Sequence, residues 1–339
     1  MKKSGARALG IIVLLCGSAF LASSNVAQLE EQPNQLDANR RLLPSIGPGL
    51  RAVRVSADGR TYVLASPSPG LVVFDKQSKP MITIGPPAAV SKDVRLPIIF
   101  GEDCDVNAQG KIYVADRGAN LIQVFSPEGV LLRSISINAP ISVAALPDDE
   151  VAVSTLHEPR LVVVFDKNGR VVREFGEPEQ ITDREDLNRF LNIGELATDA
   201  QGHLYYAFEY MPEPTVRQYD RNGYAGQDVQ YTAPDAYPEA QAIRREIVRQ
   251  EKRSKAPSFK RVLTAVGIDP ATGEVWMGVG NNLLRFDKDG NRRDTYQLYT
   301  TTGARLEADI ILISKDHLVV GNDPLGIYEF NRPDKKTEP

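Results

Sequence analysis

The chain has 339 residues, of which 42% are hydrophobic and 25% are charged, and its formal net charge at pH 7 is −4. This composition is that of a globular protein and excludes a fibrous or disordered one. The acidic balance gives no reason to expect nucleic-acid binding, which usually needs a basic surplus. The length suits two ordinary domains or one large all-β domain.

The first 24 residues have the order of a secretory signal. Lys2, Lys3 and Arg7 precede an apolar stretch from Leu9 to Leu21, and small residues follow it. The stretch is short for a membrane span, so we expect no span in the mature chain. The sequence predicts export, to the periplasm or the outside of the cell. An uncleaved N-terminal anchor is the alternative.

The two cysteines have different predicted roles. Cys16 follows Val13-Leu14-Leu15, whereas a lipidated cysteine usually follows a small residue, so the sequence disfavours a lipoprotein. Removal of the signal leaves Cys104 alone, and no intramolecular disulfide is then possible. We expect Cys104 to be a small buried side chain within a strand.

A degenerate repeat of about 40 residues follows residues 25–41, which we expect to be flexible. One unit extends from Leu50 to Gly85 and contains four short β-rich runs separated by turn residues. Runs that are apolar on both faces, such as Leu161–Phe165, suit a sheet packed between two others. The pattern predicts an all-β domain over residues 42–331, followed by a polar tail at 332–339. The related units occupy residues 104–135, 141–175, 194–230, 262–299 and 307–330.

Recurring turn residues separate the runs. Asp58-Gly59 joins the first and second runs of one unit, and Asn168-Gly169 and Asp289-Gly290 join third and fourth runs. Asn-Gly and Asp-Gly accept the positive φ angles that tight hairpins require. Each unit is therefore predicted to be a four-stranded antiparallel sheet.

The second unit resembles an NHL repeat over residues 110–129, which read GKIYVADRGANLIQVFSPEG. Residues 162–176, VVVFDKNGRVVREFG, resemble the second half of another such repeat. The resemblance extends as a pattern over most of residues 42–331. It implies a six-bladed β-propeller, in which the sheets, or blades, stand radially about an axis.

The last unit lacks a fourth run. It supplies runs at Ala308–Ile313, His317–Gly321 and Gly326–Phe330 and then enters the polar tail. Residues 42–47 precede the first unit and end as other fourth runs do. We predict that 42–47 complete the sixth blade by pairing with the strand that holds Tyr328, which closes the ring and hides its edges.

Three insertions interrupt the repeat, at residues 86–102, 177–193 and 231–260. Each connects the last strand of one blade to the first strand of the next, so all three are predicted on one face, the elaborated face. The turns that join first to second strands and third to fourth strands occupy the opposite face, the tight-turn face. Short helices are predicted after Thr182, where Thr-x-x-Glu fits a capping box, and over residues 238–255. The second helix is either a lid or partner-docking element or a solvated helix packed on the rim.

Acidic residues at the starts of innermost strands form one candidate site. Glu102, Asp103, Glu195 and Asp309 should meet near the axis, where oxygen ligands could hold Ca²⁺. This placement resembles that of gluconolactonase-like propellers; the alternative is a set of solvated or paired carboxylates. The three histidines, at 157, 203 and 317, are too widely separated to share a zinc ion. No other cofactor is predicted.

The loops that join second and third strands form the other candidate site. They lie on the elaborated face, and their mixed polar residues suit ligand contacts. The sequence shows no Gly-x-Ser-x-Gly elbow, phosphate-binding glycine loop or His-Glu-x-x-His motif. The candidate ligand-binding residues are Arg117, Asn120, His157, Glu158, Arg160, Glu209, Tyr210, Asn281, Asn282, Asn322 and Asp323.

Three functions are compatible with these patterns. The leading hypothesis is a non-catalytic binding propeller whose elaborated face binds a protein, peptide or glycan. The alternative is a Ca²⁺-dependent lactonase or related hydrolase that uses the axial carboxylates. A purely structural propeller within a surface assembly is the third, because propellers host unrelated functions.

Overall fold

The computed structural model describes residues 33–66, 70–85, 98–232, 238–253 and 256–333. The chain divides into residues 1–32 and a compact unit that begins at Pro33. The predicted signal, residues 1–24, lies outside the described residues. No helix in the described part of the chain is both long and apolar enough to cross a bilayer.

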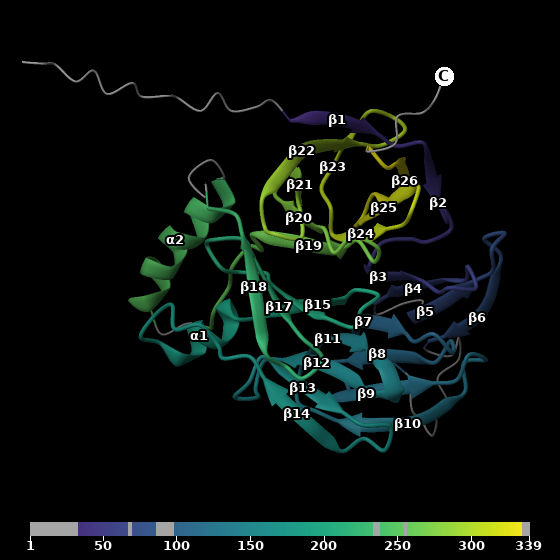
Figure 1. Ribbon diagram of the computed structural model, residues 1–339, viewed down its shortest axis with the longest axis horizontal. Coiled ribbons are helices and arrows are strands. Elements are labelled where there is room, and N and C mark those ends of the chain that lie inside the picture. The colour runs from purple at the N-terminus through teal and green to yellow at the C-terminus, as the bar shows by residue number, and fades with distance from the viewer. Residues whose placement is uncertain (1–32, 67–69, 86–97, 233–237, 254–255, 334–339) are drawn as a thin grey trace, which may run out of the picture. The chain divides into compact units, whose positions relative to one another are not determined.

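Six antiparallel sheets stand around one axis, and Figure 1 shows their innermost strands gathered at the centre. The predicted six-bladed β-propeller is therefore confirmed. Blade 1 comprises β3 (Leu50–Val55), β4 (Thr61–Ala65), β5 (Gly70–Phe74) and β6 (Pro80–Ile84); blade 2 comprises β7 (Gly101–Val106), β8 (Ile112–Asp116), β9 (Leu121–Phe125) and β10 (Leu131–Ser136); blade 3 comprises β11 (Pro140–Ala145), β12 (Val151–Thr155), β13 (Val162–Phe165) and β14 (Val171–Phe175). Blade 4 comprises β15 (Gly194–Thr198), β16 (Leu204–Phe208), β17 (Thr215–Tyr219) and β18 (Ala225–Gln230); blade 5 comprises β19 (Leu263–Ile268), β20 (Val275–Val279), β21 (Asn282–Phe286) and β22 (Arg292–Tyr299); blade 6 comprises β24 (Ile310–Ile313), β25 (His317–Asn322), β26 (Gly326–Asn331) and β2 (Arg40–Leu42).

A repeated residue pair builds the hairpin between third and fourth strands. A buried aromatic residue precedes an Asp or Ser, whose side-chain oxygen accepts hydrogen bonds from the backbone two and four residues further on. In blade 3, Asp166 accepts from Arg170 at 2.9 Å and from Asn168 at 2.8 Å, and these bonds lower the pKa of Asp166. The pairs are Phe74-Asp75, Phe125-Ser126, Phe165-Asp166, Tyr219-Asp220 and Phe286-Asp287.

The N-terminal strand β2 closes the ring, but not with the predicted residues. Arg41 of β2 pairs with Tyr328 of β26, so the partner strand is the expected one. The closing strand is Arg40–Leu42 instead of 42–47, and only Leu42 belongs to both. Hydrogen bonds fix this register, because Arg40 donates to both carboxylate oxygens of Glu329 at 2.8 and 3.0 Å. Leu43 and Ile46 instead pack in the core between blades 6 and 1.

The predicted flexible segment 25–41 also needs correction over its last residues. Strand β1 (Asn34–Asp37) runs parallel to β22 and adds an outer strand to blade 5, with Leu36 opposite Leu298. A short strand, β23 (Arg305–Leu306), pairs with the same strand β22. Residues 34–42 therefore cover the outer edges of two consecutive blades, as Figure 1 shows.

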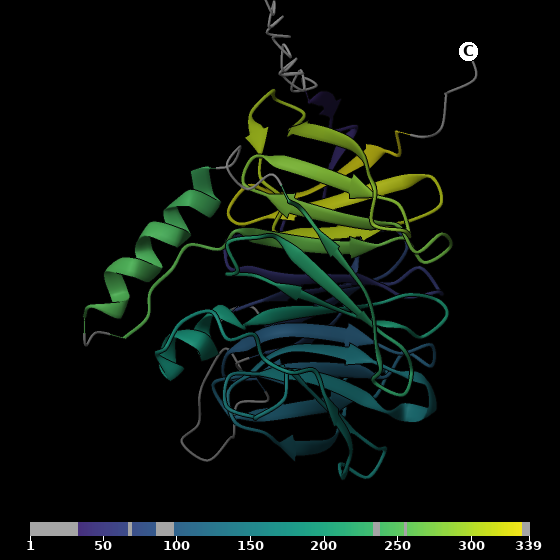
Figure 2. The same cartoon turned by 60° about the vertical axis from the view of Figure 1, so that its left-hand side comes forward.

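Both described helices lie on the elaborated face, as Figure 2 shows for α1 (Glu185–Leu191) and α2 (Pro238–Glu251). The predicted capping box does not form at α1, whose N-cap is Arg184 without a side-chain cap bond. In α2, Ile243 and Ile247 are buried, whereas Val248 is 53% exposed. The tight-turn face holds the hairpins and one short 3₁₀ turn, η1 (Pro147–Asp149).

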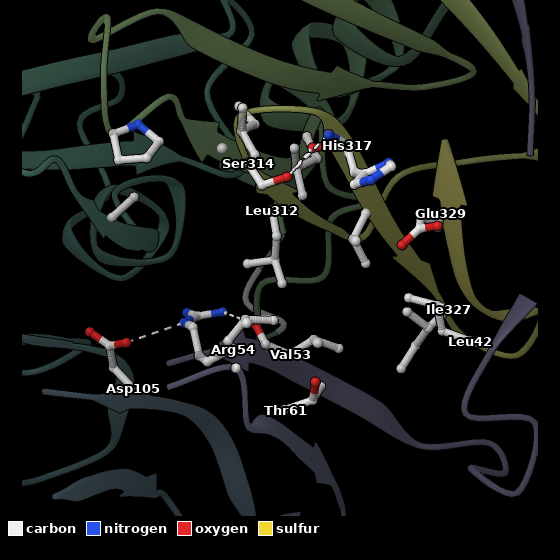
Figure 3. Close-up of a pocket in the computed structure, with 18 of the residues that line it drawn as sticks. Leu42, Val53, Arg54, Thr61, Asp105, Leu312, Ser314, His317, Ile327 and Glu329 are labelled. Atoms are coloured by element: carbon white, nitrogen blue, oxygen red, sulfur yellow. Dashed lines mark hydrogen bonds and ion pairs between the residues drawn. The ribbon is translucent and has the colours of Figure 1, made fainter. Parts of the chain in front are cut away.

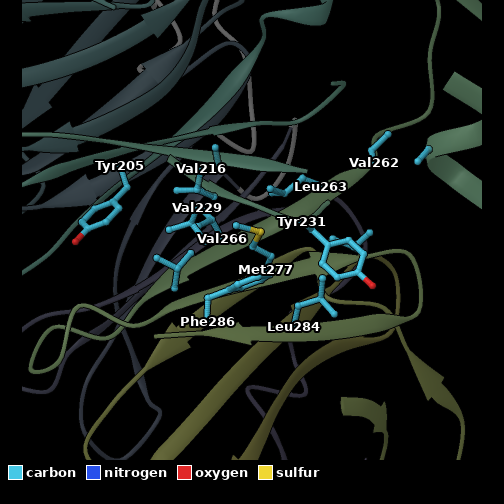
Figure 4. Packing of buried hydrophobic residues seen from close by; sticks show 14 of the residues in the cluster. Tyr205, Val216, Val229, Tyr231, Val262, Leu263, Val266, Met277, Leu284 and Phe286 are labelled. Atoms are coloured by element: carbon cyan, nitrogen blue, oxygen red, sulfur yellow. The ribbon is translucent and has the colours of Figure 1, made fainter. Parts of the chain in front are cut away.

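Hydrophobic layers between neighbouring blades form the core. Figure 4 shows the layer between blades 4 and 5, where Val216 and Val229 meet Met277 and Phe286. Helix α2 extends this layer with Ala240, Ile243 and Ile247. Cys104 of β7 is 1% exposed between blades 1 and 2, as its sequence context predicts. The blades are thus held by packing on both faces.

The predicted polar tail covers residues 332–339, and its first residue, Arg332, is held against blade 5. Arg332 forms an ion pair with Asp269 and another with Glu274 at 3.0 Å, which ties the chain after β26 to blade 5. Residues 334–339 lie outside the described residues.

Candidate functional site: the axial channel

Charged side chains from the innermost strands meet around the propeller axis. Arg54 of β3 places its Nη2 3.0 Å from Asp103 Oδ1, and its Nε lies 3.6 Å from Asp105 Oδ1. Both carboxylates belong to β7. The sequence carries a signal for this cluster, because charged residues stand within the innermost strands, as Arg54 does in β3 and Asp103 and Asp105 do in β7.

Asp103 connects three blades. Its Oδ2 accepts hydrogen bonds from Ser142 Oγ at 2.6 Å and from the Val143 backbone at 3.1 Å, both on β11. Ser142 Oγ in turn accepts a bond from the Leu196 backbone of β15 at 3.0 Å. A polar chain therefore crosses blades 1 to 4 close to the axis, and Asp103 is its central member.

Glu195 of β15 differs from these paired groups. Among the described residues, no hydrogen bond or ion pair involves its carboxyl group. Burial raises the pKa of Glu195 to about 8; the Asp103 charge contributes, and Arg54 acts against it. The side chain is half-buried, and part of it borders the channel.

A second group of charges lies nearer the elaborated face. Arg261 Nη2 is 3.0 Å from Asp309 Oδ1, and Asn322 donates to Asp309 Oδ2 at 2.9 Å. The carboxyl group of Glu209 forms no hydrogen bond or ion pair with any described residue. Burial raises the pKa of Glu209, and the nearby Arg261 opposes that change.

The four predicted calcium ligands do not form a metal site in the described part of the chain. No group of three or more His, Cys, Asp or Glu side chains there is arranged to hold a metal ion. Arginines engage three of the four carboxylates: Asp103 binds Arg54, Glu102 lies 2.9 Å from Arg117, and Asp309 binds Arg261. Glu195 lacks such a partner among the described residues.

Some predicted loop residues meet near the axis. Asn322 and the backbone N–H of Asp323 both donate hydrogen bonds to Asp309. Asp309 pairs with Arg261, whose charge also acts on Glu209. Arg117 forms its ion pair with Glu102 at the same mouth. Tyr210 follows Glu209 and packs its ring 4.7 Å from that of Phe190 in α1.

Other predicted loop residues lie apart from the axis. Asn120 has a structural role, because its Oδ1 accepts a bond from the Ala139 backbone at 2.9 Å. Glu158 and Arg160 line a pocket of about 250 Å³ beside α1. His157 and Asn281 are exposed, and Asn282 is half-buried at the start of β21. The structure therefore distributes the predicted loop site over several blades.

A pocket near the axis opens on the tight-turn face. This axial pocket has a volume of about 620 Å³ and extends from Glu195 at the axis into the gap between blades 6 and 1. That volume suits a small organic ligand, since such sites usually measure 300–1,000 Å³. In Figure 3, Leu42, Val53, Leu312 and Ile327 form its apolar walls.

Charged and polar groups occupy the two ends of the axial pocket. Arg54 and Asp105 lie at the inner end, and Glu329 and His317 lie at the outer end (Figure 3). The sequence gives no signal for this pocket, because most of its walls are ordinary apolar strand residues. They line a cavity because the ring brings residues of blades 1, 4, 5 and 6 together around the axis.

Comparisons with known proteins agree on the fold. No family model matches the sequence, and no curated protein has a detectably similar sequence. A streptogramin B lyase structure is similar, with a TM-score of 0.55 and 13% identity over 86% of this chain and 96% of that one. The chain is a six-bladed β-propeller.

Two further solved structures resemble this propeller. Virginiamycin B lyase from Staphylococcus aureus has a TM-score of 0.52 and 12% identity, covering 87% of this chain and 88% of that one. Kuenenia stuttgartiensis hydrazine synthase has a TM-score of 0.53 and 11% identity, covering 85% and 97%. At these identities the likeness shows the architecture alone, since one fold hosts many activities.

Proposed function

We propose that this propeller is a non-catalytic binding protein whose ligand occupies the axial pocket. The observation that carries the proposal is the pocket itself, with about 620 Å³ enclosed by apolar walls and polar groups at its ends. Binding sites for small molecules combine these features. The ligand is a small molecule, or one segment of a protein, peptide or glycan. Because residues 1–24 predict export, we further propose that this ligand is bound in the periplasm or outside the cell.

The catalytic alternative receives less support. A calcium-dependent hydrolase needs several oxygen ligands that converge on one point. In the part of the chain that the structure describes, the axial carboxylates mostly bind arginine, and no metal-binding group is present. The binding hypothesis needs no such convergence.

A second candidate site lies on the elaborated face. The pocket of about 250 Å³ beside α1 includes Glu158 and Arg160, two of the residues predicted for ligand contacts. It is smaller than the axial pocket, and its walls belong to the loop between β12 and β13 and to the insertion at residues 177–193. We propose it as the alternative surface for a peptide or glycan.

Blocking the axial pocket tests the main proposal. Leu312→Trp enlarges a side chain in the wall of the pocket, so it should reduce the affinity for the neutral hydrophobic probe N-phenyl-1-naphthylamine by about tenfold or more. The matched control is Leu131→Trp, at a position 48% exposed on β10, which should bind as the wild type does. Equal binding by Leu312→Trp and wild type would place the probe elsewhere, and loss of binding in Arg160→Ala instead would favour the second pocket.

A further inference from the structure

The charges along the axis do not balance. Around the inner end of the axial pocket, Arg54 faces Asp103, Asp105 and Glu195, and no other cation lies within ion-pair distance of these three carboxyl groups among the described residues. The next charges along the channel are Glu209 and the pair of Arg261 with Asp309, so they add no positive surplus. An additional cation at this end would be stabilised, and an additional anion would be repelled.

Glu195 is the carboxyl group that remains available. Asp103 is saturated by Arg54, Ser142 and Val143, and Asp105 accepts a bond from the Ala145 backbone at 2.8 Å. Glu195 is half-buried, borders the pocket and has no such partner in the described part of the chain. Its carboxylate lacks the hydrogen-bond donors that Asp103 and Asp105 have, so a donor that a ligand brings would satisfy it.

The pocket walls define the rest of the ligand. From Glu195 outward, the pocket is lined by Leu196, Val266 and Leu312, and then by Val53 and Ile327 at the seam between blades 6 and 1. These side chains offer contact surface and no hydrogen bonds. They suit an alkyl or other apolar chain attached to the charged group.

We propose that the axial pocket binds an amphiphilic amine, with its ammonium group at Glu195 and its apolar chain along the wall between blades 6 and 1. This inference rests on the proposed binding function and assigns its ligand class. Glu195 is the counter-ion of the ammonium group. Next to it, the single positive charge of Arg54 faces the two carboxylates of Asp103 and Asp105, so the local charge is negative. The three donors of an ammonium group can satisfy a carboxylate that the protein leaves without a partner.

Three probes of equal chain length test the proposal: n-octylammonium, 1-octanol and octanoate. For the wild-type protein at pH 8, calorimetry should show octylammonium binding about tenfold or more tightly than octanol, with octanoate weakest. In Glu195→Gln the octanol affinity should be unchanged and the preference for octylammonium should be lost. The matched control is Glu174→Gln, an exposed position on β14, which should keep that preference.

The outcomes separate the two proposals. If octanol and octylammonium bind equally to the wild type, or if Glu195→Gln keeps the preference, the ammonium assignment is wrong and the pocket still binds apolar molecules. If none of the three probes binds, the proposed binding function of this pocket is wrong. The comparison among probes on the wild type needs no variant, so it decides the question even if Glu195→Gln fails to fold.

Discussion

Replacing Glu195 by Gln should stabilise the ligand-free propeller, and only at neutral to alkaline pH. Burial raises the pKa of this carboxyl group from 4.5 to about 8. A group whose pKa is higher in the folded state carries no penalty below its unfolded pKa, and it opposes folding increasingly until the pH passes the folded pKa. The penalty therefore develops between pH 4.5 and about 8. Gln has nearly the same shape and cannot ionise.

The size of the effect follows from the pKa change. A rise from 4.5 to about 8 corresponds to at most about 5 kcal/mol at alkaline pH. Glu195 borders the open pocket, so we expect about half of that, roughly 2–3 kcal/mol. For a protein of this size the gain corresponds to an increase in Tm of about 5 °C.

Melting curves of wild type and Glu195→Gln at pH 5 and pH 8.5 provide the measurement. The two proteins should melt nearly together at pH 5, and the variant should melt higher at pH 8.5. Glu174→Gln makes the same chemical change at an exposed site and should follow the wild type at both pH values. A Glu195→Gln difference that is equal at both pH values, or larger at pH 5, would refute the reasoning.

Two further predictions concern how the ring is held. Asp103→Asn removes the charge that Arg54 binds at 3.0 Å and weakens the hydrogen bond from Ser142. It should therefore lower the free energy of unfolding in urea by about 3 kcal/mol. The control Asp58→Asn, in an exposed hairpin, should change that free energy by less than about 1 kcal/mol. A chain that begins at Leu43 lacks β1 and β2 and exposes the edges of β22 and β26, so it should aggregate or melt at least about 10 °C below a chain that begins at Pro33. Equal stability of the Asp103→Asn and Asp58→Asn proteins, or of the two truncated chains, would contradict these interpretations.

Local sequence signals were sufficient for the blades. The turn at Asn168-Gly169 works as predicted, since Gly169 adopts a φ of 79° and the preceding Asp166 orders the hairpin. Such signals act over four or five residues and are therefore visible in the chain itself. The same holds for Cys104, whose place within a predicted strand indicated its burial.

The ring closure was predictable only in outline. A missing fourth run in the last unit indicated that an N-terminal strand must supply it, and β2 does so. The register was not predictable, because it depends on Arg40 meeting Glu329 across 289 residues of sequence. The pairing of β1 with β22 rests on contacts of the same long-range kind.

The sequence predicts the contacts of the candidate site less well than it predicts the blades. The chain's own repeat placed Glu195 and Asp309 on innermost strands, but it could not show that Asp309 binds Arg261 while Glu195 keeps no partner among the described residues. Hydrogen bonding in hairpins depends on near neighbours, so repeats reveal it. Which carboxyl group stays unsatisfied, and where blades 6 and 1 leave a cavity, depend on side chains brought together from all around the ring.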